Sequence, residues 1–218
     1  MDRGPARVFL AATAVAVTIA GAARAEPAEP SFRSTVERIG ESMRAQMASW
    51  HRGCPVGIDS LRLVTVSYWG FDGRVHDGRL VVGRRHTGAV VRALGSLFAA
   101  RFPVRRMRPI DAYGGNDHRS MAADNTSAFN CRRVAGSSSW SEHAYGRAID
   151  INPLENPWVE NGHVSPPGGA AYADRSRRAK GMIHAGGVVV RAFAAMGWGW
   201  GGNWSSPKDY QHFSATGH

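Results

Sequence analysis

Two histidines and two aspartates in the C-terminal half of the chain have the types and spacing of a metal-dependent hydrolytic site. His143 precedes Asp150 by seven residues in "SEHAYGRAIDIN", and Asp209 precedes His212 by three in "KDYQHF". Two neutral imidazoles and one carboxylate form a three-ligand zinc set that leaves a fourth position for water. The sequence therefore predicts that His143, Asp150 and His212 bind zinc. A hydrogen-bonded structural His–Asp pair is the alternative that these residues alone leave open.

A hydrolytic zinc site also needs a base for its water. Zinc lowers the pKa of a bound water to about 7, so a nearby carboxylate can accept the proton at neutral pH. Asp209 is the nearest candidate, and Glu142 is the next. On one regular strand Asp209 and His212 would point to opposite faces, so we expect a bend over 207–209.

The elements around these residues must bring two separate segments together. "GRAIDIN" has the pattern of a short strand that carries Asp150 on one face. The odd spacing keeps His143 off that face, so we expect it in the turn before Gly146, oriented by a local hydrogen bond from Ser141. His212 should come from an adjacent C-terminal strand around "YQHF".

The rest of the chain alternates between helical and strand patterns. The expected elements are a helix over 31–50, a β-hairpin over 61–85 around "FDG", a helix over 87–102, a strand over 103–110 and a helix over 186–198. The polar stretch over 111–140 lacks a clean period, and loops of this length inside compact domains are often functional. The mixed order predicts an α+β fold, a small antiparallel sheet with flanking helices.

The helix expected over 31–50 rests on two local patterns. Ser34 and Glu37 have the spacing of a capping box. An apolar stripe at helical spacing runs through the same segment: Val36, Ile39, Met43 and Met47.

The N-terminus is typical of a secretory signal peptide over 1–25. Arg3 and Arg7 precede an apolar run over 8–20, and "ARA" ends at Ala25. The run is too short for a spanning helix, so we expect no membrane span after cleavage. The predicted division is a signal peptide over 1–25, a leader and N-terminal helix over 26–53 and a catalytic domain over 54–218, in a secreted, periplasmic or wall-associated protein.

The composition indicates a basic exported protein. The formal net charge is +10, and about +8 remains after removal of the signal peptide. Such a charge favours electrostatic contact with an anionic cell wall. Export and the scattered arginines argue against nucleic acid as a partner. Cys54 and Cys131 are the only cysteines, and export favours one disulfide between them.

The two motifs resemble those of the zinc D-alanyl-D-alanine carboxypeptidase family. "SEHAYGRAIDIN" is similar to its Ser-x-His-x-x-Gly-x-Ala-x-Asp segment, and "DYQHF" to its second segment. The family includes vancomycin-resistance carboxypeptidases, zinc D-Ala-D-Ala dipeptidases and phage L-alanyl-D-glutamate endolysins. The resemblance implies the hedgehog/D-Ala-D-Ala peptidase fold, zinc on His143, Asp150 and His212, and Asp209 as general base.

The same resemblance implies a substrate-binding arginine upstream of the first motif. Arg132 in "SAFNCR" best matches that place, with Arg133 and Arg119 as rivals. The implied activity is hydrolysis of peptidoglycan stem peptides, of either the D-alanyl-D-alanine carboxypeptidase or the L-alanyl-D-glutamate endopeptidase type. The alternative function is a non-catalytic, zinc-containing module that binds the cell wall.

Overall fold

The computed structural model describes residues 1, 2, 4 and 29–218. The chain divides into two compact units, Met1–Pro30 and Ser31–His218, and the second contains every helix and strand of the described residues. The predicted signal peptide falls almost entirely outside the described residues. Along the described part of the chain, no helix has both the length and the apolar character needed to cross a membrane.

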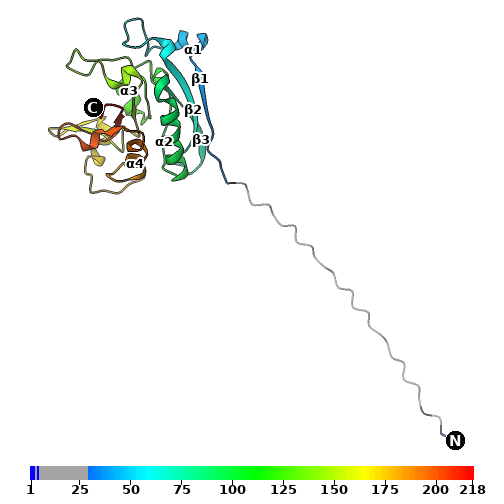
Figure 1. Ribbon diagram of the computed structural model, residues 1–218. Coiled ribbons are helices and arrows are strands. Elements are labelled where there is room, and N and C mark those ends of the chain that lie inside the picture. Colours follow the sequence, from blue (N-terminus) through cyan, green and yellow to red (C-terminus); the bar gives the residue numbers. More distant parts are fainter. Residues whose placement is uncertain (3, 5–28) are drawn as a thin grey trace. The chain divides into compact units, whose positions relative to one another are not determined.

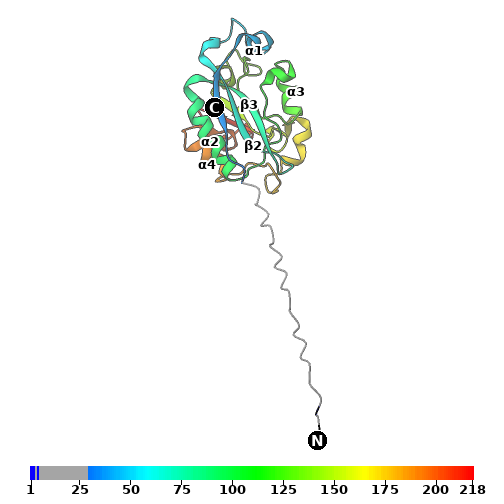
Figure 2. The ribbon, with the colours of Figure 1, turned by 90° about the vertical axis from the view of Figure 1, so that its right-hand side faces the viewer.

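The longest strands form an antiparallel sheet in the order β1-β2-β3. These are β1 Ser34–Arg38, β2 Leu61–Trp69 and β3 Val75–Gly83. β2 and β3 are the predicted hairpin, and Figure 2 shows them side by side across the unit. The predicted helix that follows is α2 Thr87–Ala99, which contacts both β2 and α4 Val188–Ala194. α2 therefore lies between the long sheet and the part of the fold that carries α4 (Figure 1).

The single helix predicted over 31–50 is wrong. Its first half is β1, which pairs antiparallel with β2, and only α1 Glu41–Gln46 is helical. Pairing with β1 satisfies backbone groups along an edge of β2 that would otherwise stay open, and this outweighs the local capping pattern. Gly40, in extended conformation, separates the two elements. Of the expected apolar stripe, Val36 is exposed whereas Met47 is buried.

The strand predicted over 103–110 is also wrong. This segment forms only isolated bridges, Trp69 to Pro103 and Met107 to Thr126. Pro103 and Pro109 lack the N–H groups that a continuous ladder requires.

Two small antiparallel sheets complete the fold. One has the order β4-β9-β7 and the other β6-β5-β8. Their strands, with the remaining helix, are β4 Ala148–Asp150, β5 Trp158–Glu160, β6 His163–Ser165, β7 Gly199–Trp200, β8 Lys208–Asp209, β9 His212–Ser214 and α3 Asp117–Ala122. Antiparallel sheets with few helices agree with the predicted α+β class.

The main core joins the long sheet to the strands of the candidate site. Buried side chains from β2, β3, α2, α4, β4 and β9 form one cluster. Within it, the ring of Phe193 on α4 stacks on Phe213 of β9 with centroids 4.4 Å apart. This packing fixes the strand that carries His212.

The predicted disulfide between Cys54 and Cys131 is present, with Cα atoms 5.7 Å apart. It links the segment before β2 to the segment that carries Arg132. Closing a loop of this length stabilises the fold by about 4 kcal/mol in the chain-entropy model.

Candidate metal centre and active site

β4 and β9 bring the two predicted motifs together. Asp150 and His212 are direct cross-strand partners, so their side chains share one face of the sheet. His143 lies in a 3₁₀ helix, Glu142–Tyr145, just before β4, in the turn that the spacing required. All three side chains are buried.

Local hydrogen bonds and two glycines hold the turn that carries His143. Ser141 Oγ accepts a hydrogen bond from the backbone N–H of His143 at 3.3 Å. The turn ends at Gly146, whose φ of 65° lies in the left-handed region. The carbonyl of Gly146 accepts a 2.7 Å hydrogen bond from Gly83 of β3, and a Cβ on Gly146 would lie 2.5 Å from that nitrogen. Only glycine allows this approach to the long sheet.

Two ring nitrogens and the two oxygens of one carboxylate converge at the centre of the site. His143 Nε2 lies 3.2 Å from Asp150 Oδ2, and His212 Nδ1 lies 3.0 Å from Asp150 Oδ1. The two inward nitrogens are 3.2 Å apart.

The outer ring nitrogens define the tautomers. His143 Nδ1 donates to the carbonyl of Ala128 at 2.5 Å, and His212 Nε2 donates to the carbonyl of His218 at 3.3 Å. Because each neutral imidazole carries one N–H, the inward nitrogens present lone pairs to each other and to the Asp150 carboxylate. Mutually facing acceptors of this kind are stabilised by a cation between them, either a metal ion or a proton on one ring nitrogen.

The donor set fits a zinc ion. Tetrahedral zinc with bonds of 2.0–2.2 Å places neighbouring ligand atoms about 3.3 Å apart, close to the 3.0–3.2 Å that separate the two inward nitrogens from each other and from the nearer Asp150 oxygen. The backbone carbonyls on the outer nitrogens are the kind of partners that orient histidine ligands. Burial opposes ionisation of Asp150, but the positive charge and hydrogen bonds that His143 and His212 supply when protonated hold the pKa of Asp150 well below its usual range. The carboxylate is thus kept in the form that a metal binds.

Asp209 reaches the site from a different sheet. It lies on β8, paired with Trp158 of β5, whereas His212 begins β9. The chain bends over 204–207 and again at 210–211, so the expected bend includes Pro207, but Lys208 and Asp209 form β8 and the turn that separates Asp209 from His212 follows Asp209. Asp209 Oδ1 is buried and has no hydrogen-bond partner among the described residues. Burial, reinforced by the charge of Asp150, raises the pKa of Asp209 to about 7.

Arg132 faces the same site. Its charge acts on Asp209 and lowers the pKa of that group, against the larger effect of burial. Arg132 Nη2 forms a 3.0 Å ion pair with Asp117 Oδ2. Arg132 Nε is buried and has no acceptor in the described part of the chain. Asp117 therefore holds Arg132 at Nη2, and the Nε–H of the same guanidinium is left as a donor without an acceptor.

The rival side chains have other contacts. Arg133 lies over the Trp140 ring at 3.6 Å, and Arg119 is exposed. Glu142, the second candidate base, accepts two hydrogen bonds from Arg147 at 2.7 and 2.9 Å. None of these three shows the free, buried polar atom found on Arg132 and Asp209.

Two further side chains contribute to the site, and no sequence motif assigns either of them to it. Asp117, at the start of α3, anchors Arg132 and also accepts from Asn130 Nδ2 at 3.3 Å. Trp204 packs its ring 5.4 Å from that of His212. The polar composition of 111–140 indicated a functional loop, but the segment contains α3, which begins at Asp117, and no motif distinguished this residue from its neighbours.

Comparison with known proteins supports a peptidase. Residues 135–215 match the family model described as D-alanyl-D-alanine carboxypeptidase. The match contains His143, Asp150, Asp209 and His212 and begins after Arg132. It confirms the resemblance to the zinc D-alanyl-D-alanine carboxypeptidase family. Searches of curated proteins and of solved structures found no match.

Proposed function

We propose that the protein is an exported zinc peptidase that hydrolyses stem peptides of peptidoglycan, of the D-alanyl-D-alanine carboxypeptidase or L-alanyl-D-glutamate endopeptidase type. The observation that carries this proposal is the convergence of three metal-ligand atoms beside an unpartnered carboxylate oxygen. The matched family supplies the substrate class. The proposal extends to the hedgehog/D-Ala-D-Ala peptidase fold and to attraction of the basic protein to an anionic wall.

His143, Asp150 and His212 would hold the metal, and their hydrogen bonds to backbone carbonyls would keep the ligand atoms in place. Zinc, when bound, supplies Lewis acidity to a water and to the scissile carbonyl. Asp209 Oδ1 takes the proton of the attacking water and returns it to the leaving amine. A carboxylate buried this deeply keeps the proton between the two steps, because burial raises its pKa.

Arg132 would bind the oxygen that becomes negative as the carbonyl is attacked. Its free Nε–H is a preformed donor whose position is fixed by Asp117 through the other end of the guanidinium. A donor held in place before the reaction stabilises developing charge at little reorganisation cost.

Digestion of purified peptidoglycan by the zinc-loaded protein tests the function. We expect released fragments whose masses identify either loss of a terminal D-alanine or cleavage between L-alanine and D-glutamate. A chelator should abolish the release, and added zinc should restore it. Binding to peptidoglycan without any release would favour the non-catalytic module, and release that resists chelation would contradict the zinc mechanism.

A further inference from the structure

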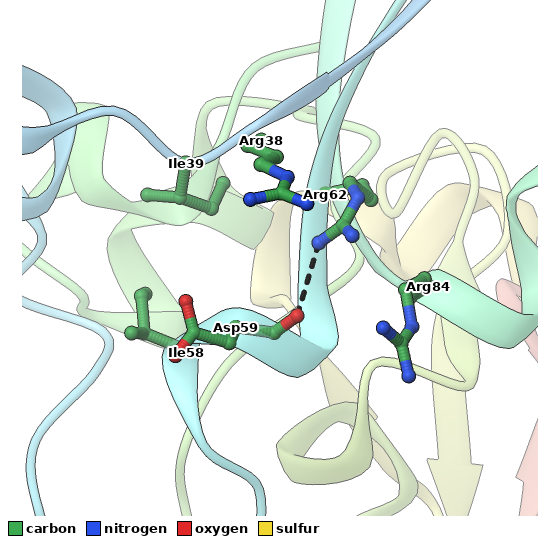
Figure 3. Close-up of a pocket in the computed structure, with 6 residues that line it drawn as sticks. All are labelled: Arg38, Ile39, Ile58, Asp59, Arg62 and Arg84. Atoms are coloured by element: carbon green, nitrogen blue, oxygen red, sulfur yellow. Dashed lines mark hydrogen bonds between the residues drawn. The ribbon is translucent and has the colours of Figure 1, made fainter.

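A basic pocket lies outside the metal centre. It has a volume of about 310 Å³ and is lined by Arg38, Ile39, Ile58, Asp59, Arg62 and Arg84 (Figure 3). This size is at the lower end of small-ligand pockets, about 300–1,000 Å³. None of the residues assigned to the metal centre lines it. Three arginines against one aspartate give the lining a formal charge of +2.

The sheet register forces two of these charges together. Arg38 of β1 and Arg62 of β2 are direct cross-strand partners, so both side chains leave the same face of the sheet. Like charges at such positions destabilise a sheet. Arg84 approaches from the 3₁₀ helix Arg84–His86, which follows the end of β3. Two elements of the sheet and the turn after it thus direct guanidinium groups to one place.

These charges are not neutralised by the protein. Within the described part of the chain, no carboxylate lies within ion-pair distance of Arg38, Arg62 or Arg84, although Asp59 shares the pocket. Arg62 Nη1 donates to the carbonyls of Asp59 and Leu61, at 3.0 and 2.7 Å. Figure 3 shows the first of these bonds, which holds the Arg62 guanidinium beside the pocket. The pocket is therefore a place where an anion would relieve repulsion.

We propose that this pocket binds a phosphate group. A carboxylate is satisfied by the fork of one arginine, whereas a phosphate has enough oxygens and charge to accept hydrogen bonds from several guanidinium groups. The source is either free phosphate or a phosphodiester polymer. The site would then act as an anchor that is separate from catalysis.

A neighbouring hollow extends the basic surface to the end of the 3₁₀ helix Glu142–Tyr145. It shares Arg84 and adds Arg85 and Tyr145, among others. Tyr145 ends the 3₁₀ helix that carries His143. A polymer anchored at the three arginines could thus continue along the outer face of the 3₁₀ helix that carries His143.

Thermal unfolding in phosphate tests the site without any use of hydrolysis, so its outcome is independent of the proposed peptidase activity. Chloride is replaced by inorganic phosphate at constant ionic strength. At ten times the Kd, bound phosphate should raise the Tm of the wild type by about 2–4 °C more than that of Arg38→Gln/Arg62→Gln. The comparison with the variant is needed because phosphate also stabilises proteins by exclusion from their surface.

Two further variants keep the test specific. Arg84→Gln changes an exposed residue outside the sheet and should weaken phosphate binding about tenfold, even if the double variant does not fold. Arg79→Gln removes the same charge from an exposed position of β3 that lines neither pocket, and it should bind like the wild type. Equal phosphate shifts in the wild type and in Arg84→Gln, or an equal loss in Arg79→Gln, would overturn the proposal.

A fluorescent oligomer of glycerol phosphate separates the two sources. If the oligomer binds the wild type more tightly than inorganic phosphate does, and loses this advantage in Arg84→Gln, the pocket serves a polymer. If both bind equally per phosphate group, the pocket serves free phosphate. If neither binds differently to wild type and Arg84→Gln, no phosphate site exists there.

Discussion

Glu155, in the segment after β4, should make the free energy of unfolding depend on pH, and replacing Glu155 by Gln should remove this dependence. Glu155 and Asp124 are both buried, with 2% and 3% of their surfaces exposed. Arg105 is the nearby cation, with Nη2 3.6 Å from Glu155 Oε1 and Nε 3.4 Å from Asp124 Oδ2. Glu155 Oε2 is buried and has no partner among the described residues. One arginine therefore serves two buried carboxyl groups.

The sign of the effect follows from the direction of the shift. Burial, together with the neighbouring Asp124, raises the pKa of Glu155 to about 8 in the folded protein. The unfolded chain has the ordinary value near 4.3, so the folded state holds one more proton between these two pH values. The stabilisation is complete below about pH 4.3 and is lost as the pH rises through about 8.

The magnitude is measurable with ordinary unfolding experiments. While the folded state holds one proton more than the unfolded state, each rise of one pH unit lowers the free energy of unfolding by about 1.4 kcal/mol. The total is about 3 kcal/mol between about pH 5.5 and 7.5. Glu155→Gln has no ionisation and should lack this decline. Urea unfolding at three pH values, followed by tryptophan fluorescence in the presence of chelator, gives the difference between the two proteins.

A matched variant and a clear contrary result complete this test. Glu37→Gln removes an exposed carboxyl from β1 and should follow the wild type at every pH. If the difference between wild type and Glu155→Gln stays constant from about pH 5.5 to 7.5, Glu155 is ionised in the folded protein and the reasoning about its burial is refuted.

Three other predictions concern Arg132, the proposed substrate arginine, and the disulfide. Arg132→Lys keeps the charge but loses the planar fork, so kcat/KM should fall about tenfold or more with zinc content unchanged, and unchanged kinetics would move the role to Arg133. Asp117→Asn should act through Arg132, so it should lower kcat/KM when introduced alone but have little further effect when combined with Arg132→Lys. Additive losses in the double variant would show that Asp117 acts elsewhere. Cys54→Ser/Cys131→Ser should lower the free energy of unfolding by about 4 kcal/mol, and mass spectrometry of the non-reduced wild type should find no alkylatable thiol.

The three candidate metal ligands could be proposed from the sequence because their residue types, and the spacing within each of the two motifs, are local features. His143 had to lie in the turn before the strand, and the structure places it there. The approach of Asp209 was harder to predict, since it depends on a switch between two sheets that occurs at 210–211. Alternation along one strand cannot reveal that the strand ends.

Contacts between distant segments explain the other differences. The segment over 34–38 has helical capping signals, but pairing with β2 decides its conformation. With this segment predicted as a helix, the sequence could not indicate that the like-charged Arg38 and Arg62 lie opposite each other. That pair exists only in the observed strand register. Likewise, nothing near Asp117 in the sequence indicates that it anchors Arg132, and Glu155 gains its unusual environment from Asp124.

The peptide-hydrolysis rate of Asp209→Asn at full zinc occupancy is the most direct test of the proposed mechanism, with His212→Ala as the comparison. His212→Ala removes one of three ligands and should lose both zinc and activity. Asp209→Asn keeps the shape of the side chain but cannot accept the proton, so it should retain zinc while turnover falls about 10²- to 10⁴-fold. Hydrolysis by Asp209→Asn at the wild-type rate, or loss of its zinc, would contradict the assignment of Asp209 as the base.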